Sequence, residues 1–272
     1  MTFNKIFGIG LLCVVATASY AQEYPVKPVR IIVPFSPGGF VDNSARAISD
    51  KLGNRLGQQV VVENRAGASG NLGTSQVAQS APDGYTLLLG FDGTLVINPS
   101  VYAKLPFDSV RDFAPITKIG DGSLIIVAHP SLPANNLKEL IALSKAKPGT
   151  LSYGTSGTGS TPHVFMELMK MQLGIDWLHI PYKGGGQAIV DVTGGSIPLV
   201  GTAIATAQQY IKQGRLKAIG IANAKRDPAL PDVPTFAESG APDLITYSWS
   251  GLLAPIRHGR SSTGCIARWS WC

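Results

Sequence analysis

Short apolar runs alternate along this chain with stretches whose apolar residues recur at helical spacing. Val29–Phe35 is almost wholly apolar, and Ala45, Ile48 and Leu52 follow it as on one face of a helix. The same alternation predicts strands at 29–35, 59–63, 85–91, 123–128, 151–154, 178–181, 197–201 and 216–222, and helices at 41–56, 72–79, 137–146, 162–172, 187–193 and 205–214. Continuously apolar strands are typical of parallel sheets covered on both faces. The pattern therefore predicts an α/β protein with mostly parallel sheets flanked by helices.

Three glycine-rich turns each follow an apolar run and precede a helical one. They are Pro34–Gly39, Gly154–Thr161 and Tyr182–Gly186. Backbone N–H groups at a helix N-terminus attract negative charge, and glycine allows close approach because it has no Cβ. In open α/β sheets, ligands bind beyond the carboxyl ends of the strands. The turns therefore predict one anion held between two lobes.

The length of 272 residues allows two lobes of about 100–150 residues. We expect lobe 1 at 22–120, lobe 2 at 121–222 and a return segment to lobe 1 at 223–255. The crossings between the lobes are predicted near Lys118–Ser123 and Ile221–Lys225.

The first 21 residues have the pattern of a secretory signal peptide. Lys5 is followed by the apolar stretch Ile6–Ala18, and Ser19-Tyr20-Ala21 fits a cleavage site after Ala21. The apolar stretch is too short for a membrane span, although an uncleaved anchor is the alternative. The expected location is the periplasm.

The charge and the cysteine content exclude several classes of function. The formal net charge is +6, but the basic residues are scattered and form no run interleaved with aromatics, so we expect no nucleic-acid partner. Cys13, Cys265 and Cys272 are the three cysteines, and none falls between Gln22 and Gly264. A disulfide framework, a cysteine nucleophile and a zinc knuckle are therefore excluded from that segment.

Several longer motifs resemble the Bug-type extracytoplasmic solute receptors associated with tripartite tricarboxylate transporters. The motifs occur in the family's order and span about 22–255. They are Pro34-Phe-Ser-Pro-Gly-Gly-Phe-Val-Asp42, Val62-Glu-Asn-Arg-Ala-Gly-Ala-Ser-Gly70, Ala81-Pro-Asp-Gly-Tyr85, Ile97-Asn-Pro-Ser-Val-Tyr102, Leu105-Pro-Phe-Asp108, Asp112-Phe-Ala-Pro115, Pro181-Tyr-Lys-Gly-Gly185, Leu230-Pro-Asp-Val-Pro-Thr235 and Ser248-Trp-Ser-Gly-Leu-Leu-Ala-Pro255.

This resemblance implies a type II periplasmic binding protein fold with two α/β lobes closing over a small carboxylate. It implies binding largely through backbone amides, with no catalysis, cofactor or metal. The implied partners are membrane transporter subunits. A sensor kinase is the alternative partner, and we expect a monomer.

The candidate ligand contacts lie in the predicted turns. In the first lobe they are Phe35, Ser36, Pro37, Gly38, Gly39, Asp42, Asp92, Gly93 and Thr94, and in the second they are Ser156, Gly157, Thr158, Gly159, Ser160, Thr161, His163, Tyr182, Lys183, Gly184, Gly185, Thr202 and Ala203. Asp42 either caps the following helix or receives a ligand ammonium or hydroxyl group. At Thr202 the chain departs from the family pattern, which often has an acidic residue there.

The runner-up function is a secreted hydrolase. It would use Ser156 or Ser160 with His163 as the base. Against it, neither Gly154–Thr158 nor Gly67–Asn71 completes the Gly-x-Ser-x-Gly pattern of a nucleophile elbow.

Residues 256–272 form an aberrant tail without helical or strand periodicity. If each codon from Arg260 on is read from its third base, Ser261–Ile266 can encode Val-Val-Asp-Arg-Leu-His, which restores an amphipathic helix. We therefore expect a frameshift near 256–260 that truncates the C-terminal part. A divergent tail is the alternative, and the nucleotide sequence distinguishes the two.

Overall fold

The computed structural model describes residues 24–256. The predicted signal peptide and the tail beyond Ile256 lie outside the described residues. No helix within the described range has the length and apolar character needed to cross a bilayer.

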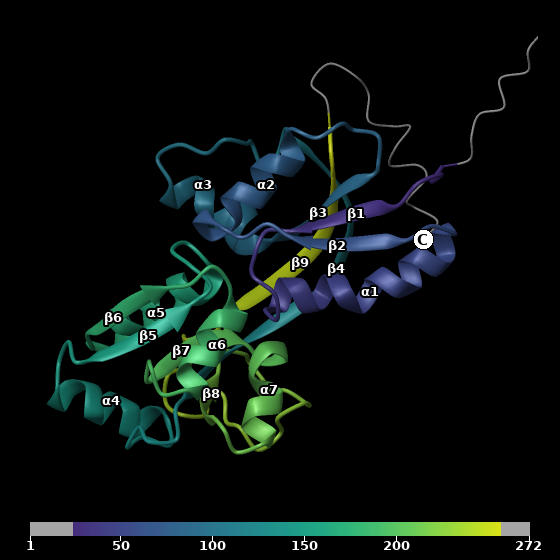
Figure 1. Cartoon of the computed structure of the whole chain (residues 1–272). Coiled ribbons are helices and arrows are strands. Elements are labelled where there is room, and N and C mark those ends of the chain that lie inside the picture. Colours follow the sequence, from purple (N-terminus) through teal and green to yellow (C-terminus); the bar gives the residue numbers. More distant parts are fainter. Residues whose placement is uncertain (1–23, 257–272) are drawn as a thin grey trace, which may run out of the picture.

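Lobe 1 is built around a parallel three-stranded unit. Its strands are β1 (Val29–Val33), β2 (Val60–Asn64) and β3 (Thr86–Phe91), and its helices are α1 (Phe40–Leu56), α2 (Asn71–Ala78) and α3 (Asn98–Val101), with short helical turns η1 (Ala68–Gly70) and η2 (Gly93–Ile97). Successive side chains of a strand point to opposite faces. Ile31 accordingly packs with Ala45 of α1, whereas Ile32 packs with Val77 of α2. The two helices therefore cover opposite faces of the sheet (Figure 1).

Lobe 2 repeats this arrangement. Its strands are β5 (Leu151–Thr155), β6 (Trp177–Pro181), β7 (Leu199–Ala203) and β8 (Lys217–Ile221), and its helices are α4 (Leu137–Ala146), α5 (Thr161–Leu173), α6 (Gly185–Thr193) and α7 (Ile204–Lys212). β5 pairs in parallel with β6 and β7. Leu199 packs with Trp177 and Met166 on the α5 face, and Val200 packs with Ile189 on the α6 face.

Two antiparallel strands join the lobes. They are β4 (Phe113–Ala128) and β9 (Tyr247–Pro255). β9 lies between β3 and β4 in lobe 1, and the far end of β4 pairs with β7 and β8 in lobe 2. The result is one sheet path in the order β2-β1-β3-β9-β4-β7-β5-β6 (Figure 1). The expected two-lobe α/β architecture is confirmed, with parallel strands on its flanks and antiparallel strands at its centre.

The first crossing falls within β4, where the sequence places it, but the second is later than expected. After β8 the chain stays on lobe 2, where Phe236 and Leu244 join the core. The Thr246 N–H donates to Ala222 O at 2.8 Å. The return to lobe 1 is therefore β9 rather than Ile221–Lys225.

Candidate functional site

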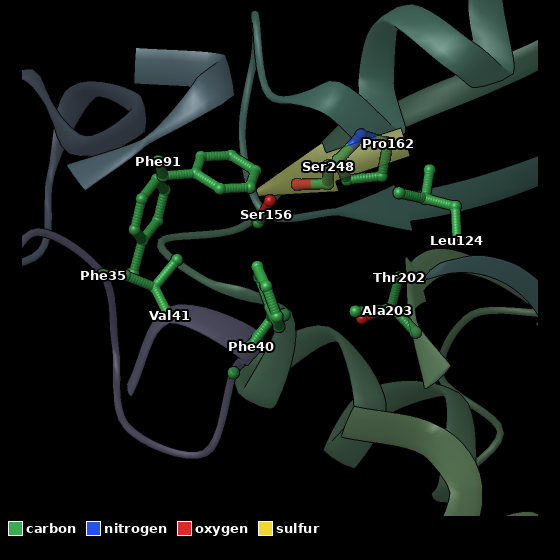
Figure 2. Close-up of a pocket in the computed structure, with 12 residues that line it drawn as sticks. Phe35, Phe40, Val41, Phe91, Leu124, Ser156, Pro162, Thr202, Ala203 and Ser248 are labelled. Carbon is green, nitrogen blue, oxygen red and sulfur yellow. The ribbon is translucent and has the colours of Figure 1, made fainter. Parts of the chain in front are cut away.

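A small pocket lies between the two lobes. It is lined by Phe35, Gly39, Phe40, Val41, Phe91, Leu124, Ser156, Pro162, Gly185, Thr202, Ala203 and Ser248 (Figure 2). Its volume is about 30 Å³, which is room for about two water molecules. None of the 12 lining residues carries a charged side chain.

Four helices begin at this pocket. Gly39 precedes α1, Pro162 lies in the first turn of α5, Gly185 is the first residue of α6, and Ala203 precedes α7. No side chain caps any of these four N-termini with a hydrogen bond. The first N–H groups of a helix have no intrahelical acceptor and carry the positive end of the helix dipole. The pocket is therefore suited to an anion although it contains no cationic side chain.

Three of these helix starts adjoin one another directly. A Cβ added to Gly39 would lie 3.4 Å from the Gly185 nitrogen, and a Cβ added to Gly185 would lie 3.0 Å from Thr202 Oγ1. Glycine at both positions leaves the backbone N–H groups open to a ligand. The hydroxyl of Thr202 adds a side-chain donor at the same place.

The opposite end of the pocket is apolar. Phe35 and Phe91 make an edge-to-face contact with ring centroids 5.4 Å apart. Figure 2 shows Val41 beside these rings, while Thr202 and Ala203 lie at the other end of the pocket. Phe40 extends between the two ends (Figure 2). The pocket thus has a polar end and an aromatic end.

Asp42 holds the Ser36–Gly39 turn from behind the pocket. Its carboxylate accepts hydrogen bonds from Gly38 N–H at 2.9 Å, Arg46 Nε at 2.9 Å and Asn64 Nδ2 at 2.8 Å. Burial alone would raise the pKa of Asp42, but these hydrogen bonds outweigh it and lower the pKa below its usual 3.8. Asp42 does not line the pocket. Asp42 therefore supports the turn before α1 from outside the pocket, and its hydrogen bond reaches Gly38 rather than an N–H group of the helix.

The lowered pKa of Asp42 predicts an acid-sensitive fold. Its stabilising contribution is fully present above the unfolded pKa, near 3.8, and is lost as the pH falls through the lower folded pKa. We expect the free energy of unfolding to fall more steeply below pH 4 in the unaltered protein than in Asp42→Asn. Urea unfolding between pH 7 and pH 3 measures the difference, and parallel curves would contradict it.

Asp92 ties the second lobe to the crossing strand. Its Oδ2 accepts from Thr161 Oγ1 of α5, and its Oδ1 accepts from Ser248 Oγ of β9, both at 2.7 Å. Burial raises the pKa of Asp92, although the hydrogen bonds from Ser248 and Thr161 oppose the rise. No salt bridge between described residues involves Asp92.

The glycine-rich turns of the two lobes meet at a backbone seam. The Ser36 N–H donates to Lys183 O at 3.0 Å. A Cβ on Gly186 would lie 2.2 Å from Pro37 O, and one on Gly184 would lie 2.2 Å from Ser36 Oγ. Only glycine allows this approach. The Lys183 side chain is exposed and does not line the pocket.

The structure divides the candidate contacts into three groups. The residues on the pocket lining are Phe35, Gly39, Ser156, Gly185, Thr202 and Ala203. A second group lies in the seam or makes other contacts between the turns or between the lobes: Ser36, Pro37, Gly38, Asp92, Gly93, Gly157, Thr158, Gly159, Thr161, Lys183 and Gly184. The remaining residues hydrogen-bond away from the lining: Asp42, Thr94, Ser160, His163 and Tyr182.

The sequence interpretation missed half of the lining. The additional residues are Phe40, Val41, Phe91, Leu124, Pro162 and Ser248. Phe40 and Val41 directly follow the Gly38-Gly39 turn, and Phe91 directly precedes Asp92. These three residues could have been predicted because their neighbours in the sequence were already candidate contacts. Leu124 and Ser248 belong to the crossing strands, whose place at the pocket depends on the topology.

The hydrolase alternative gains no support from the hydrogen bonds. Ser160 Oγ donates to Gly157 O at 2.7 Å, and His163 Nδ1 accepts from Gly159 N–H at 3.2 Å. Neither hydrogen bond joins a serine to the histidine. Within residues 24–256, no group of three or more His, Cys, Asp or Glu residues is arranged to hold a metal ion.

Known proteins resemble this chain in sequence and in fold. Protein BugT of Bordetella pertussis is 38% identical over 242 residues, which are 89% of this chain and 74% of that protein. The solved periplasmic binding protein BugD is 35% identical with a TM-score of 0.85, over 91% of this chain and 82% of that one.

Two further solved structures contain bound acids. One is an R. palustris protein with adipate, 33% identical with a TM-score of 0.86, over 91% of this chain and 82% of that one. The other is MatC from Rhodopseudomonas palustris with bound malate, 31% identical with a TM-score of 0.82, over 90% of this chain and 85% of that one. The periplasmic binding protein fold predicted from the sequence is thereby confirmed.

The family model that matches is described as the tripartite tricarboxylate transporter family receptor. It covers residues 44–260, and so most of both lobes and β9. The resemblance of the sequence motifs to Bug-type receptors agrees with it. The chain belongs to the tripartite tricarboxylate transporter receptor family.

Proposed function

We propose that this protein binds a small organic carboxylate between its lobes in the periplasm and delivers it to the membrane subunits of a tripartite tricarboxylate-type transporter. One observation carries the proposal: four helix N-termini without side-chain caps meet at a single interlobe pocket. Backbone N–H groups there would bind a carboxylate through charge-assisted hydrogen bonds. The adipate and malate in the two R. palustris structures support the same ligand class.

Binding couples to movement of the lobes in this proposal. A volume of about 30 Å³ is too small for an organic acid, so the lobes must separate to admit one. The Ser36–Lys183 and Asp92–Thr161 hydrogen bonds bridge the lobes and would break on opening. A ligand contacting both lobes then favours a closed arrangement with the lobes slightly further apart than here, in which it reaches helix starts of both lobes.

The protein acts as a monomeric receptor rather than an enzyme in this proposal. Its family consists of transporter receptors. Ser156 and Thr202 offer hydroxyl donors to a ligand in the pocket, and no general base is hydrogen-bonded to Ser160. The chemistry on the lining is that of binding and release.

Thermal unfolding of the full chain with a panel of organic anions tests the proposal. The panel contains mono-, di- and tricarboxylates and acidic amino acids, with the corresponding amides as uncharged controls. At a ligand concentration a hundredfold above Kd, a carboxylate should stabilise the protein by about 2.7 kcal/mol. The amides should give no shift. A panel in which no carboxylate raises the melting temperature would contradict the proposed function.

A further inference from the structure

We infer that the pocket selects a monocarboxylate with an uncharged, apolar body and rejects an acid that carries a second carboxylate at its far end. The inference rests on the proposed function, since it concerns the part of the ligand beyond the carboxylate. It depends on the different chemistry of the two ends of the pocket.

The ligand carboxylate is assigned to the end where Gly39, Gly185 and Thr202 meet. The starts of α1, α6 and α7 adjoin one another there, as the distances around Gly185 establish. The Thr202 hydroxyl lies beside Gly185, so the helix starts and a side-chain donor are close together at this end. A single carboxylate is enough to occupy this end, because its two oxygens can share these donors.

The rest of the ligand would extend toward the aromatic end. Phe35, Phe91 and Val41 lie there, and each side chain is no more than 5% exposed. Leu124 pairs with Ala203 in the sheet and so lies at the other end of the pocket, whereas Pro162 adds apolar atoms to the lining. A hydrocarbon chain would bury its surface against these side chains, which is favourable in proportion to the area removed from water. A carboxylate in the same place would lose its hydration and gain neither a cation nor the helix starts that adjoin around Gly185.

Asp92 adds a negative charge close to this end. It directly follows Phe91, and its Oδ1 accepts from Ser248, which lines the pocket. None of the salt bridges among the described residues neutralises it. A second ligand carboxylate near Ser248 would face this buried charge of the same sign in a medium that screens it poorly.

Three six-carbon acids that differ only at the far end test the inference. Hexanoate ends in a methyl group, adipate in a carboxylate and 6-aminohexanoate in an ammonium group. Calorimetric titration of the full chain at pH 7 gives a Kd for each. We expect hexanoate to bind at least tenfold more tightly than adipate and more tightly than 6-aminohexanoate. Adipate binding as tightly as hexanoate would overturn the inference. Tighter binding of 6-aminohexanoate than of hexanoate would overturn the claim that the body of the ligand is uncharged.

The outcomes separate this inference from the proposed function. If adipate binds and hexanoate does not, carboxylate binding stands and the selectivity fails. If neither these three acids nor any acid of the thermal-unfolding panel binds, the proposed function itself fails, and the inference with it.

Asp92→Asn isolates the role of the buried charge. It should reduce the ratio of the adipate Kd to the hexanoate Kd at least threefold, because the repulsion is gone while the shape is kept. Asp50→Asn removes the same negative charge from an exposed position on α1 and should leave this ratio of Kd values unaltered. Thermal unfolding verifies that both variants fold. An equal ratio of the two Kd values in both variants would overturn the assignment of the repulsion to Asp92. The comparison of the three acids in the unaltered chain tests the selectivity independently of these variants.

Discussion

Replacing Gly186 by alanine should abolish tight ligand binding while leaving the fold intact. The new Cβ would lie 2.2 Å from Pro37 O and 3.1 Å from the Gly38 carbonyl carbon, both of which are backbone atoms of the other lobe. The lobes could then no longer meet at the seam. Within α6 the change itself is favourable by up to about 1 kcal/mol, because alanine forms helix better than glycine. We expect Kd to rise about a hundredfold, equivalent to about 2.7 kcal/mol.

Gly194→Ala is the matched control at the other end of the same helix. A Cβ there would be in ordinary contact, 3.5 Å from Val190 O, and the φ angle of −81° suits alanine. Calorimetric titration with the tightest acid of the panel should give the unaltered Kd for this control. An unaltered Kd for Gly186→Ala as well would mean that ligand binding does not require the seam.

Replacing Asp42 by alanine should destabilise the protein by about 3 kcal/mol at pH 7 and weaken ligand binding. The carboxylate is 2% exposed and receives three hydrogen bonds, so its loss removes the acceptor shared by Gly38 N–H, Arg46 and Asn64. The first turn of α1 also loses a favourable negative charge. Because the same bonds hold the turn that leads to Gly39, we expect Kd to rise about tenfold.

Asp50→Ala is the control for this prediction, since Asp50 is exposed on the same helix. Its effect should stay within about 0.5 kcal/mol. Urea unfolding at pH 7 compares the two variants, and titration of the same samples compares their affinities. Similar stabilities for both variants would contradict the supporting role of Asp42.

The sequence predicts the flanks of the fold well and its centre poorly. β1 and β3 are mostly apolar, with Arg30 and Thr86 as their polar residues, so their pattern identifies them as buried strands. β9 contains Ser248, Ser250 and Gly251, which are typical of a loop, yet it is buried between β3 and β4. Gly251 is suited to this place because the neighbouring strand packs closely: a Cβ there would lie 3.2 Å from Thr117 O of β4. A local pattern cannot reveal such a tertiary requirement.

The candidate site was predictable where function depends on local backbone. Gly39 and Gly185 were identified because a glycine-rich turn between strand and helix has a physical meaning in one segment alone. The second-lobe turn was only partly identified. Ser156 lines the pocket, whereas Thr158 O accepts from Tyr102 and the Thr161 hydroxyl donates to Asp92. A sequence does not reveal which of several exposed donors will face the ligand and which will face the other lobe.

The central place of β9 has a consequence for the order in which the protein folds. Lobe 2 consists of one continuous stretch, from the end of β4 to about residue 246. The sheet of lobe 1, in contrast, stays open between β3 and β4 until Tyr247–Pro255 inserts between them. The lobe that emerges first from the ribosome is thus the last to complete its sheet. Lobe 1 therefore stays incompletely folded until the last strand of the described chain has been synthesised.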